Sequence, residues 1–241
     1  MKTQQRKKFR GRRAVLAAVA VAAASMLATT AAAAERLLLF GGEVADAAYY
    51  SFVGALLPMG AREDGRGWFQ RYWIDAFGYE YDGGPGRVQA DAYGLEGALG
   101  YGGANELGWW SVSLGLRYTD TSLEPDDEGA NARGSQLGGK FQVDFERRLA
   151  DRWRVNGIAS YTSEQNGYWM RGRLMHGASP TRGLGFEALA NGNDEADAVA
   201  VGLVKTFEPA ASGFSVGLKA GYRFQDDADG AYGGVEFGYP F

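Results

Sequence analysis

His176 is the only histidine in the 241-residue chain, so it is the first residue to consider for acid-base chemistry. It precedes Ser179 by three residues, and a histidine that activates a serine would suit a lipid-modifying hydrolase. The spacing does not match the His-x-Ser motif of lipid A deacylases, and no supporting acid is evident. We therefore interpret His176 as a solvated histidine at a turn, and we expect neither a catalytic residue nor an enzyme.

Three acidic clusters raise the question of a metal site. None has the Asp-x-Asp-x-Asp-Gly spacing with a distant glutamate that a calcium loop needs, so we interpret them as solvated loop residues. The glycine-rich stretch 100–103 is not followed by a helical pattern and predicts no phosphate cradle. The chain has no cysteine to provide a disulfide or a thiol. We expect no metal and no cofactor; the clusters are Asp126-Asp127-Glu128, Asn193-Asp194-Glu195 and Asp226-Asp227-Asp229.

Charges of both signs recur on the polar face of segments whose other face is apolar. In a closed sheet this face would line the interior, where the charges would pair and fill a small barrel. The alternative is a narrow polar channel for a sugar or another small solute, since barrels of about eight strands are filled and those of sixteen leave a pore. We favour the filled interior. The predicted lumen charges are Arg71, Asp75, Glu96, Arg117, Lys140, Asp144, Glu146, Arg154, Lys219, Arg223 and Glu236.

The elements that carry these residues have the period of β-strands. Trp110, Val112, Leu114, Leu116 and Tyr118 alternate with small or polar residues, and on a helix they would be distributed around the whole cylinder. The segments 136–146 and 214–224 alternate in the same way. Noisier alternation extends over 67–81, 87–101, 152–163, 167–176, 183–191, 197–208 and 231–241.

Strand length favours a membrane barrel over a soluble sandwich. Many segments reach ten residues, as crossing a bilayer requires, whereas globular strands average about five or six. The chain ends inside a strand, with Phe237, Tyr239 and Phe241 on one face, which is typical of the signal read by the barrel-assembly machinery. Aromatic residues lie at the ends of the apolar faces and suit interfacial girdles; they are Trp109, Trp110, Tyr118, Trp153 and Tyr161.

Connection lengths predict the topology, because outer-membrane barrels have short periplasmic turns and periplasmic termini. The external connections are 82–86, 120–134, 164–166, 192–196 and 225–230, and the periplasmic ones are 58–66, 102–106, 148–151, 177–182 and 209–212. Eleven strands are clear, and an even number is needed. The segment 37–44 supplies the twelfth through a turn at Ala45-Asp46, so we predict an all-β antiparallel barrel of about 12 strands, with 10 as the alternative.

The N-terminus has the pattern of a secretory signal peptide. Seven basic residues precede an apolar run from Ala14 to Leu27, and Ala32 and Ala34 form an Ala-x-Ala site before Glu35. We predict that residues 1–34 are removed after Sec export and that 35–241 form the barrel in the outer membrane. The mature chain would have a net charge of 18 − 29 = −11, which argues against binding to nucleic acid.

Short aromatic and glycine motifs resemble the start of the cellulose biosynthesis protein BcsS family. They are Gly41-Gly42-Glu43-Val44, Tyr49-Tyr50-Ser51-Phe52, Arg71-Tyr72-Trp73 and Tyr79-Glu80-Tyr81-Asp82-Gly83. The resemblance implies an accessory, non-enzymatic outer-membrane component of bacterial cellulose production or secretion, in contact with lipid and possible cellulose-secretion partners. The alternatives are a small outer-membrane channel and, third, a lipid hydrolase. If the protein contacts polysaccharide, Tyr81 and Trp169 are the exposed aromatic residues that we expect to stack on sugar rings.

Overall fold

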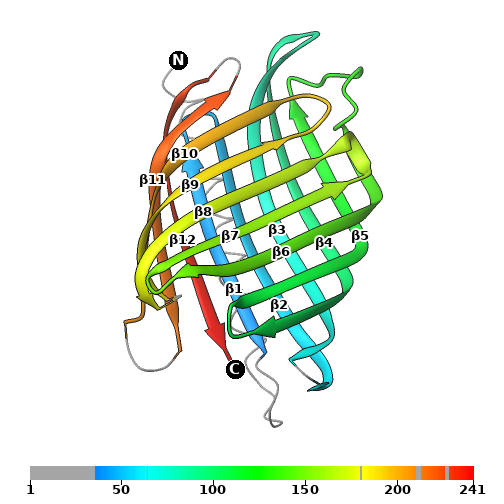
Figure 1. The fold of residues 1–241 in the computed structure, drawn as a ribbon. Helices are drawn as coiled ribbons and strands as arrows, with labels where there is room; N and C mark the ends of the chain where they lie inside the picture. Colours follow the sequence, from blue (N-terminus) through cyan, green and yellow to red (C-terminus); the bar gives the residue numbers. More distant parts are fainter. Residues whose placement is uncertain (1–35, 64, 180, 210–212, 226–227) are drawn as a thin grey trace.

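The computed structural model of the chain describes residues 36–63, 65–179, 181–209, 213–225 and 228–241. The predicted signal peptide, 1–34, lies outside these residues. The described chain folds into one closed antiparallel barrel (Figure 1). Its strands are β1 (Leu37–Ala45), β2 (Ala48–Glu63), β3 (Arg66–Gly83), β4 (Gly86–Asn105), β5 (Gly108–Glu124), β6 (Gly134–Ala150), β7 (Trp153–Thr162), β8 (Tyr168–Ser179), β9 (Arg182–Gly192), β10 (Asp197–Phe207), β11 (Ser215–Gln225) and β12 (Gly230–Pro240).

Each strand pairs with its neighbours in sequence, and β1 pairs with β12 to close the sheet. The closing register joins Leu37 to Pro240 and Ala45 to Tyr232. The predicted twelve strands are therefore confirmed, including the first one from 37 to 44. Closure leaves no sheet edge, so backbone hydrogen bonds are made between strands, as a bilayer requires.

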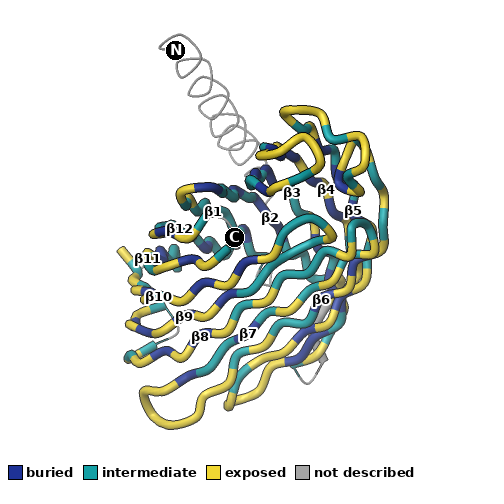
Figure 2. The backbone as a smooth tube through the Cα atoms, turned by 90° about the horizontal axis from the view of Figure 1, so that it is seen from above, coloured by how far each residue is buried: buried dark blue, intermediate teal, exposed yellow. Residues whose placement is uncertain are grey.

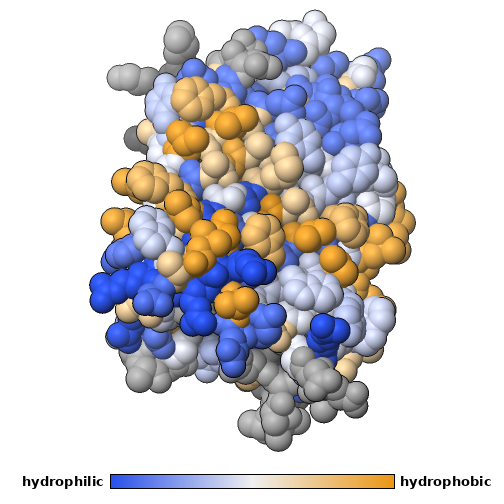
Figure 3. All heavy atoms as spheres, in the orientation of Figure 1, coloured by the Kyte–Doolittle hydropathy of each residue, from blue (hydrophilic) through white to orange (hydrophobic). Residues whose placement is uncertain are grey.

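Side chains alternate between the interior and the outer face. Buried and exposed positions succeed one another along the strands (Figure 2), as in β9, where Gly185, Glu187 and Leu189 are buried and Leu184 and Phe186 are exposed. Apolar side chains form a wide band across the visible outer face, with hydrophilic regions toward both ends (Figure 3). An apolar outer face is what contact with lipid hydrocarbon requires.

Aromatic residues lie at both borders of this outer face. Near the end that holds the C-terminus, the rings of Trp68, Tyr101 and Trp110 contact one another in sequence, at centroid distances of 5.2 and 6.1 Å. Toward the opposite end, the rings of Tyr93 and Tyr118 lie 6.2 Å apart. These rings suit the two interfaces of a membrane, where an amphipathic aromatic side chain is stable.

The predicted connections alternate between the two ends as expected, but several are shorter than predicted. β5 continues to Glu124 and β6 starts at Gly134, so the longest external connection covers 125–133 rather than 120–134. The extension occurs because β4 has 20 residues and provides backbone partners as far as Glu124. Strands β3 to β6 have 17 to 20 residues, more than the roughly 9–11 that cross a bilayer, and they extend beyond it.

Helical structure is confined to one short 3-10 turn, Glu164–Asn166, between β7 and β8 within the described chain. No helix in the described ranges is long and apolar enough to cross a membrane.

Candidate functional site

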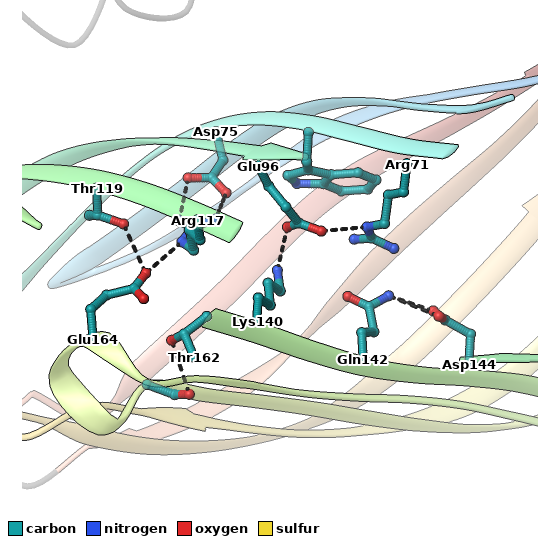
Figure 4. A network of polar contacts seen from close by, with 12 residues as sticks. Arg71, Asp75, Glu96, Arg117, Thr119, Lys140, Gln142, Asp144, Thr162 and Glu164 are labelled. Atoms are coloured by element: carbon teal, nitrogen blue, oxygen red, sulfur yellow. Dashed lines mark hydrogen bonds and ion pairs between the residues drawn. The ribbon is translucent and has the colours of Figure 1, made fainter. Parts of the chain in front are cut away.

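Two groups of charged side chains line the interior, and the first lies on β3 to β6 (Figure 4). Glu96 accepts hydrogen bonds from Arg71 Nε at 2.8 Å and from Lys140 Nζ at 2.6 Å. Arg117 donates to both carboxylate oxygens of Asp75, each at 2.8 Å. Such charge-assisted pairs hold their geometry strongly because both partners are shielded from water.

Glu164 extends this group toward the external end. Its Oε1 lies 3.7 Å from Arg117 Nε and 3.5 Å from Thr119 Oγ1. Burial raises the pKa of the Glu164 carboxyl, although Arg117 and Thr119 favour its charged form. Gly94 leaves room for the Arg117–Asp75 ion pair. A Cβ at that position would lie 2.4 Å from Arg117 Nη2 and 2.5 Å from Asp75 Oδ1.

Three more of the predicted lumen charges lie on β6 and β7, farther from the external end. Asp144 accepts from Gln142 Nε2 at 2.7 Å and from Ser111 Oγ at 3.3 Å. Arg154 donates to the Ser179 carbonyl. Glu146 interacts with Arg154 and is only partly buried. These contacts fix the side chains against the barrel wall.

The second group crosses the lumen from β8 to β12. Arg171 Nη1 donates to Glu236 Oε1 at 2.9 Å, and Arg173 makes two further 2.9 Å bonds to the same carboxylate. Arg173 also pairs with Glu187, whose other oxygen accepts from Tyr232 at 3.1 Å. Strands β9, β10 and β11 separate β8 from β12, so Glu236 bridges distant parts of the wall.

Lys219 and Arg223 complete this second group. Lys219 Nζ lies 2.6 Å from Glu43 Oε2 and 3.2 Å from Glu236 Oε1, while Arg223 Nη1 lies 3.9 Å from Glu43 Oε1. Alternating charge sign within the group neutralises most of the charge inside the barrel. Buried charges are tolerated only when paired in this way.

The structure places all eleven predicted lumen charges at inward positions and brings eight of them into ion pairs; these are Arg71, Asp75, Glu96, Arg117, Lys140, Lys219, Arg223 and Glu236. Sequence reasoning missed Glu43, Arg171, Arg173 and Glu187, and the two arginines make the contacts that cross the lumen to Glu236. The alternation of Trp169, Arg171 and Arg173 with Met170, Gly172 and Leu174 was a signal that could have found the two arginines.

Aromatic rings cover the part of the wall formed by β2 and β3. Phe52 stacks on Trp73 with centroids 4.8 Å apart, and Arg71 lies 4.4 Å above the Trp73 ring. Trp73 Nε1 donates to the Tyr50 hydroxyl at 3.0 Å. Further toward the external end, Phe77 and Tyr79 lie nearly parallel on the same strand, with centroids 6.4 Å apart.

A cavity of about 340 Å³, here called the chamber, lies between this aromatic wall and Trp169 on β8. Lys140, Arg171 and Glu236 line it together with the aromatic residues. Its outer part is formed by the polar connections at the external end, through Glu164, Gln165 and Asn193. The chamber thus joins flat apolar surfaces to hydrogen-bonding groups in one enclosure.

Three external connections meet at this end, and we call them the cap: residues 125–133, 163–167 and 193–196. The Asn131 amide donates to Glu195 Oε1 at 2.6 Å, which joins the first connection to the third. Asn193 Nδ2 donates to the Tyr79 hydroxyl at 2.9 Å and to Gln165 Oε1 at 3.4 Å. The cap therefore links β3 to the β5–β6, β7–β8 and β9–β10 connections across the mouth of the barrel.

The expected exposure of Tyr81 is wrong, whereas Trp169 lines the chamber. Tyr81 is 5% exposed, because the cap folds over it: its hydroxyl donates to Asp127 Oδ2 at 3.3 Å, and its ring packs with Val88 and Ala90. Trp169 is half-buried and has Arg171 5.4 Å from its ring. A sugar contact at Trp169 stays a prediction.

His176 lies in β8 rather than in a turn, because that strand continues to Ser179. Its ring faces outward and contacts Trp153, with centroids 4.9 Å apart. A register shift between Gly177 and Ser179 separates the two residues, and the Ser179 hydroxyl lies 3.2 Å from Thr181 Oγ1. This geometry does not support activation of Ser179 by His176.

The acidic clusters of the cap are engaged in hydrogen bonds rather than only solvated. Arg133 donates to both oxygens of Asp126, each at 2.7 Å, and this pairing lowers the pKa of the Asp126 carboxyl. Asp194 Oδ1 accepts from Asn166 at 2.8 Å. Among the residues that the structure describes, no cluster of histidine and acidic side chains could hold a metal ion. Asp226 and Asp227 lie outside the described residues.

The closed twelve-stranded barrel, the apolar outer band and the polar interior together define an outer-membrane-type β-barrel protein. Residues 37–241 match the family described as cellulose biosynthesis protein BcsS. The chain therefore belongs to the BcsS family, as the N-terminal motifs predicted.

A solved structure confirms the class of fold. The translocator domain of the autotransporter NalP from Neisseria meningitidis is similar at 12% identity and a TM-score of 0.51, with 100% of this chain and 98% of that chain covered. The KdgM porin in complex with disordered oligogalacturonate is similar at 11% identity and a TM-score of 0.46, covering 83% and 98%. Curated proteins contain no match to the chain.

Proposed function

We propose that this protein is an accessory, non-enzymatic component of cellulose biosynthesis that anchors or organises the polymer at the outer membrane. The observation that carries the proposal is the bridge from Arg171 and Arg173 to Glu236 in a barrel of the BcsS family. Because this bridge crosses the lumen, the barrel suits a supporting role at the cell surface better than that of a wide conduit for polymer.

The proposal assigns a step after polymerisation. Making a glucan requires an activated sugar and a nucleotide-binding domain, and residues 37–241 are taken up by the barrel. An exported barrel also lies outside the cytoplasm, where activated sugars are made. Passage, anchoring or organisation of finished polymer is what such a protein can contribute.

A small-solute channel is the second candidate, and the chamber favours it. A cavity of about 340 Å³ with paired charges at its base could admit a sugar-sized solute. Solute-selective conductance of the purified protein in planar bilayers would support this candidate, and the same measurement on a variant without the bridge would show whether the ion pairs limit passage.

The test of the proposed function is deletion of the gene and complementation. Dye-binding cellulose should fall or change in architecture in the deletion strain, while synthase activity in isolated inner membranes should be retained. Complementation with the wild-type gene should restore the polymer. Unchanged cellulose amount and architecture would contradict the proposal, and loss of synthase activity would point to an earlier step.

A further inference from the structure

We propose that the chamber is a binding site for a short segment of an uncharged polysaccharide, with Trp169 as its principal stacking surface. This inference rests on the proposed function for the choice of a β-glucan as ligand. The site itself is argued from four features of the barrel: facing aromatic rings, polar atoms without partners, internal charge balance and an acidic rim.

The rings suit a sugar because a pyranose presents apolar C–H faces and polar edges. Tyr50, Phe77 and Tyr79 line the chamber from β2 and β3, and Trp169 lines it from β8. The rings of Phe77 and Tyr79 are stacked only 7° from parallel, so both present the same orientation along β3. An aromatic side chain of this kind combines a large apolar area with little loss of conformational freedom.

Polar atoms at the chamber have unused hydrogen-bonding capacity. Glu164 Oε2, Gln165 Nε2 and Arg171 Nε are buried and have no hydrogen-bond partner among the described residues. All three side chains line the chamber. One is an acceptor and two are donors, so together they match the hydroxyl groups of a sugar, which both donate and accept. Leaving buried polar atoms unpaired is costly, and a small rotation of these side chains toward a bound hydroxyl would remove that cost.

Charge balance argues for a neutral polymer. At the base of the chamber, Arg171 is paired with Glu236 and Arg117 with Asp75, which leaves little unbalanced positive charge for an acidic sugar. The external end of the barrel around the chamber is strongly acidic. Arg87 and Arg133 are the basic residues that lie among its acidic residues in the described chain. Its field would repel an anionic polymer; the acidic residues are Asp46, Glu80, Asp82, Asp91, Asp120, Glu124, Asp126, Asp127, Glu128, Glu164, Asp194, Glu195, Asp197 and Asp229.

The experiment is calorimetric titration of the purified barrel with cellotetraose and, in parallel, with tetragalacturonate. The detergent must lack a sugar headgroup, because an alkyl glycoside would compete for the chamber. Cellotetraose should bind saturably and tetragalacturonate should bind at least tenfold more weakly. Absence of saturable heat with cellotetraose at millimolar concentration, or equal binding of the acidic oligomer, would overturn the proposal.

Variants locate the binding to the chamber. Trp169→Ala should weaken cellotetraose binding about tenfold or more, since it removes both buried area and the stacking ring, and Trp169→Phe should restore most of it. Trp153→Ala is the matched control, because Trp153 faces outward and is 42% exposed. Equal loss in Trp153→Ala and Trp169→Ala would place the binding elsewhere and refute the assignment.

Gln165→Ala keeps the test decisive if a strand substitution prevents folding. Gln165 lies in a connection, and removing its amide should weaken binding about fivefold, the typical effect of one hydrogen bond. Unchanged affinity in this variant would count against hydrogen bonding between the ligand and the unpaired polar atoms of the chamber. Binding in vitro together with unchanged cellulose in the deletion strain would refute the proposed function alone, whereas altered cellulose without binding would refute only this inference.

Discussion

Glu236 on β12 accepts two 2.9 Å hydrogen bonds from Arg173 on β8, although three strands separate these two along the sheet. The same carboxylate also holds Arg171 and lies 3.2 Å from Lys219. One acidic side chain thus contacts three bases that project from two parts of the wall. Its loss would leave these bases with fewer partners inside the barrel.

Glu236→Ala should therefore destabilise the barrel. It leaves Arg171 and Arg173 buried with less compensating charge, and breaking such a buried pair typically costs about 3–5 kcal/mol. Urea unfolding in detergent micelles, followed by the heat-dependent gel shift of folded barrels, measures the change. Glu128→Ala, at an exposed cap residue, is the control. Equal unfolding midpoints for both variants would contradict the stabilising role of the bridge.

The same substitution should raise ion conductance. Removing the carboxylate takes away the side chain that joins β8 to β12, so the path through the lumen should widen. Planar-bilayer recordings of wild type and Glu236→Ala, with Glu236→Gln as a variant of the same shape, provide the measurement. Conductance that is the same in all three would show that the bridge does not limit passage.

Tyr81→Ala should loosen the cap. The tyrosine belongs to the buried cluster against which Ala130 and Ala196 pack, and its hydroxyl donates to Asp127, so its removal should release the connection 125–133. Trypsin should then cleave faster after Arg133, which lies in that connection. Tyr222→Ala removes an exposed ring toward the same end, where it contacts Phe224, and serves as the control. A cleavage rate in Tyr81→Ala equal to that of the control would mean that the cap is held by other contacts.

Glu164 should make stability depend on pH in the opposite direction from most paired carboxylates. Because burial raises its pKa in the folded protein, the folded state binds a proton more readily than the unfolded chain. The contribution of this group to the free energy of unfolding therefore rises as pH falls through the raised folded value, and it levels off below the unfolded value. Glu164→Gln should remove this contribution, so thermal midpoints of wild type and variant should converge at low pH and differ most at neutral pH. Parallel midpoints across the range would disprove the effect.

Deleting Phe241 should impair assembly more than His176→Ala. The Phe241 amide donates to the Arg36 carbonyl at 2.9 Å, and its ring stacks with Tyr239, so the deletion weakens the closing seam and removes the proposed assembly signal. His176 only contacts Trp153 on the outer face. Immunoblots of outer-membrane fractions compare the two variants. Similar membrane levels would argue against the C-terminal signal.

Most of the fold could be predicted from the sequence because period-two alternation is a local property. Trp110 to Tyr118 specifies a strand and its lipid-facing side without knowledge of its neighbours, and the need for an even strand number identified 37–44. The ends of β5 and β8 could not be predicted. Pairing with the 20-residue β4 extends β5 through polar residues such as Ser122, and pairing with β9 extends β8 past His176 to Ser179.

The site could be predicted only in part. Alternation indicates that Arg117 and Glu236 point inward, but the choice of partner depends on which strands face each other across the lumen. Tyr81 illustrates the same limit: its position at the end of an apolar strand suggested exposure, and only the folded cap shows that residues 125–133 cover it. Long-range contacts of this kind leave no periodic signal in a single sequence.

The seam between β1 and β12 has a kinetic consequence. Every other strand pairing joins neighbours in the chain, whereas this one brings Leu37 to Pro240 and can form only after all the intervening residues have been synthesised and exported. Its loop-closure entropy is the largest of any pairing in the sheet, so it should form last and slowly. Until then β1 and β12 are unpaired edge strands, and each can form backbone hydrogen bonds with a strand of another chain. Stalled or truncated copies are thus the species that quality control must remove.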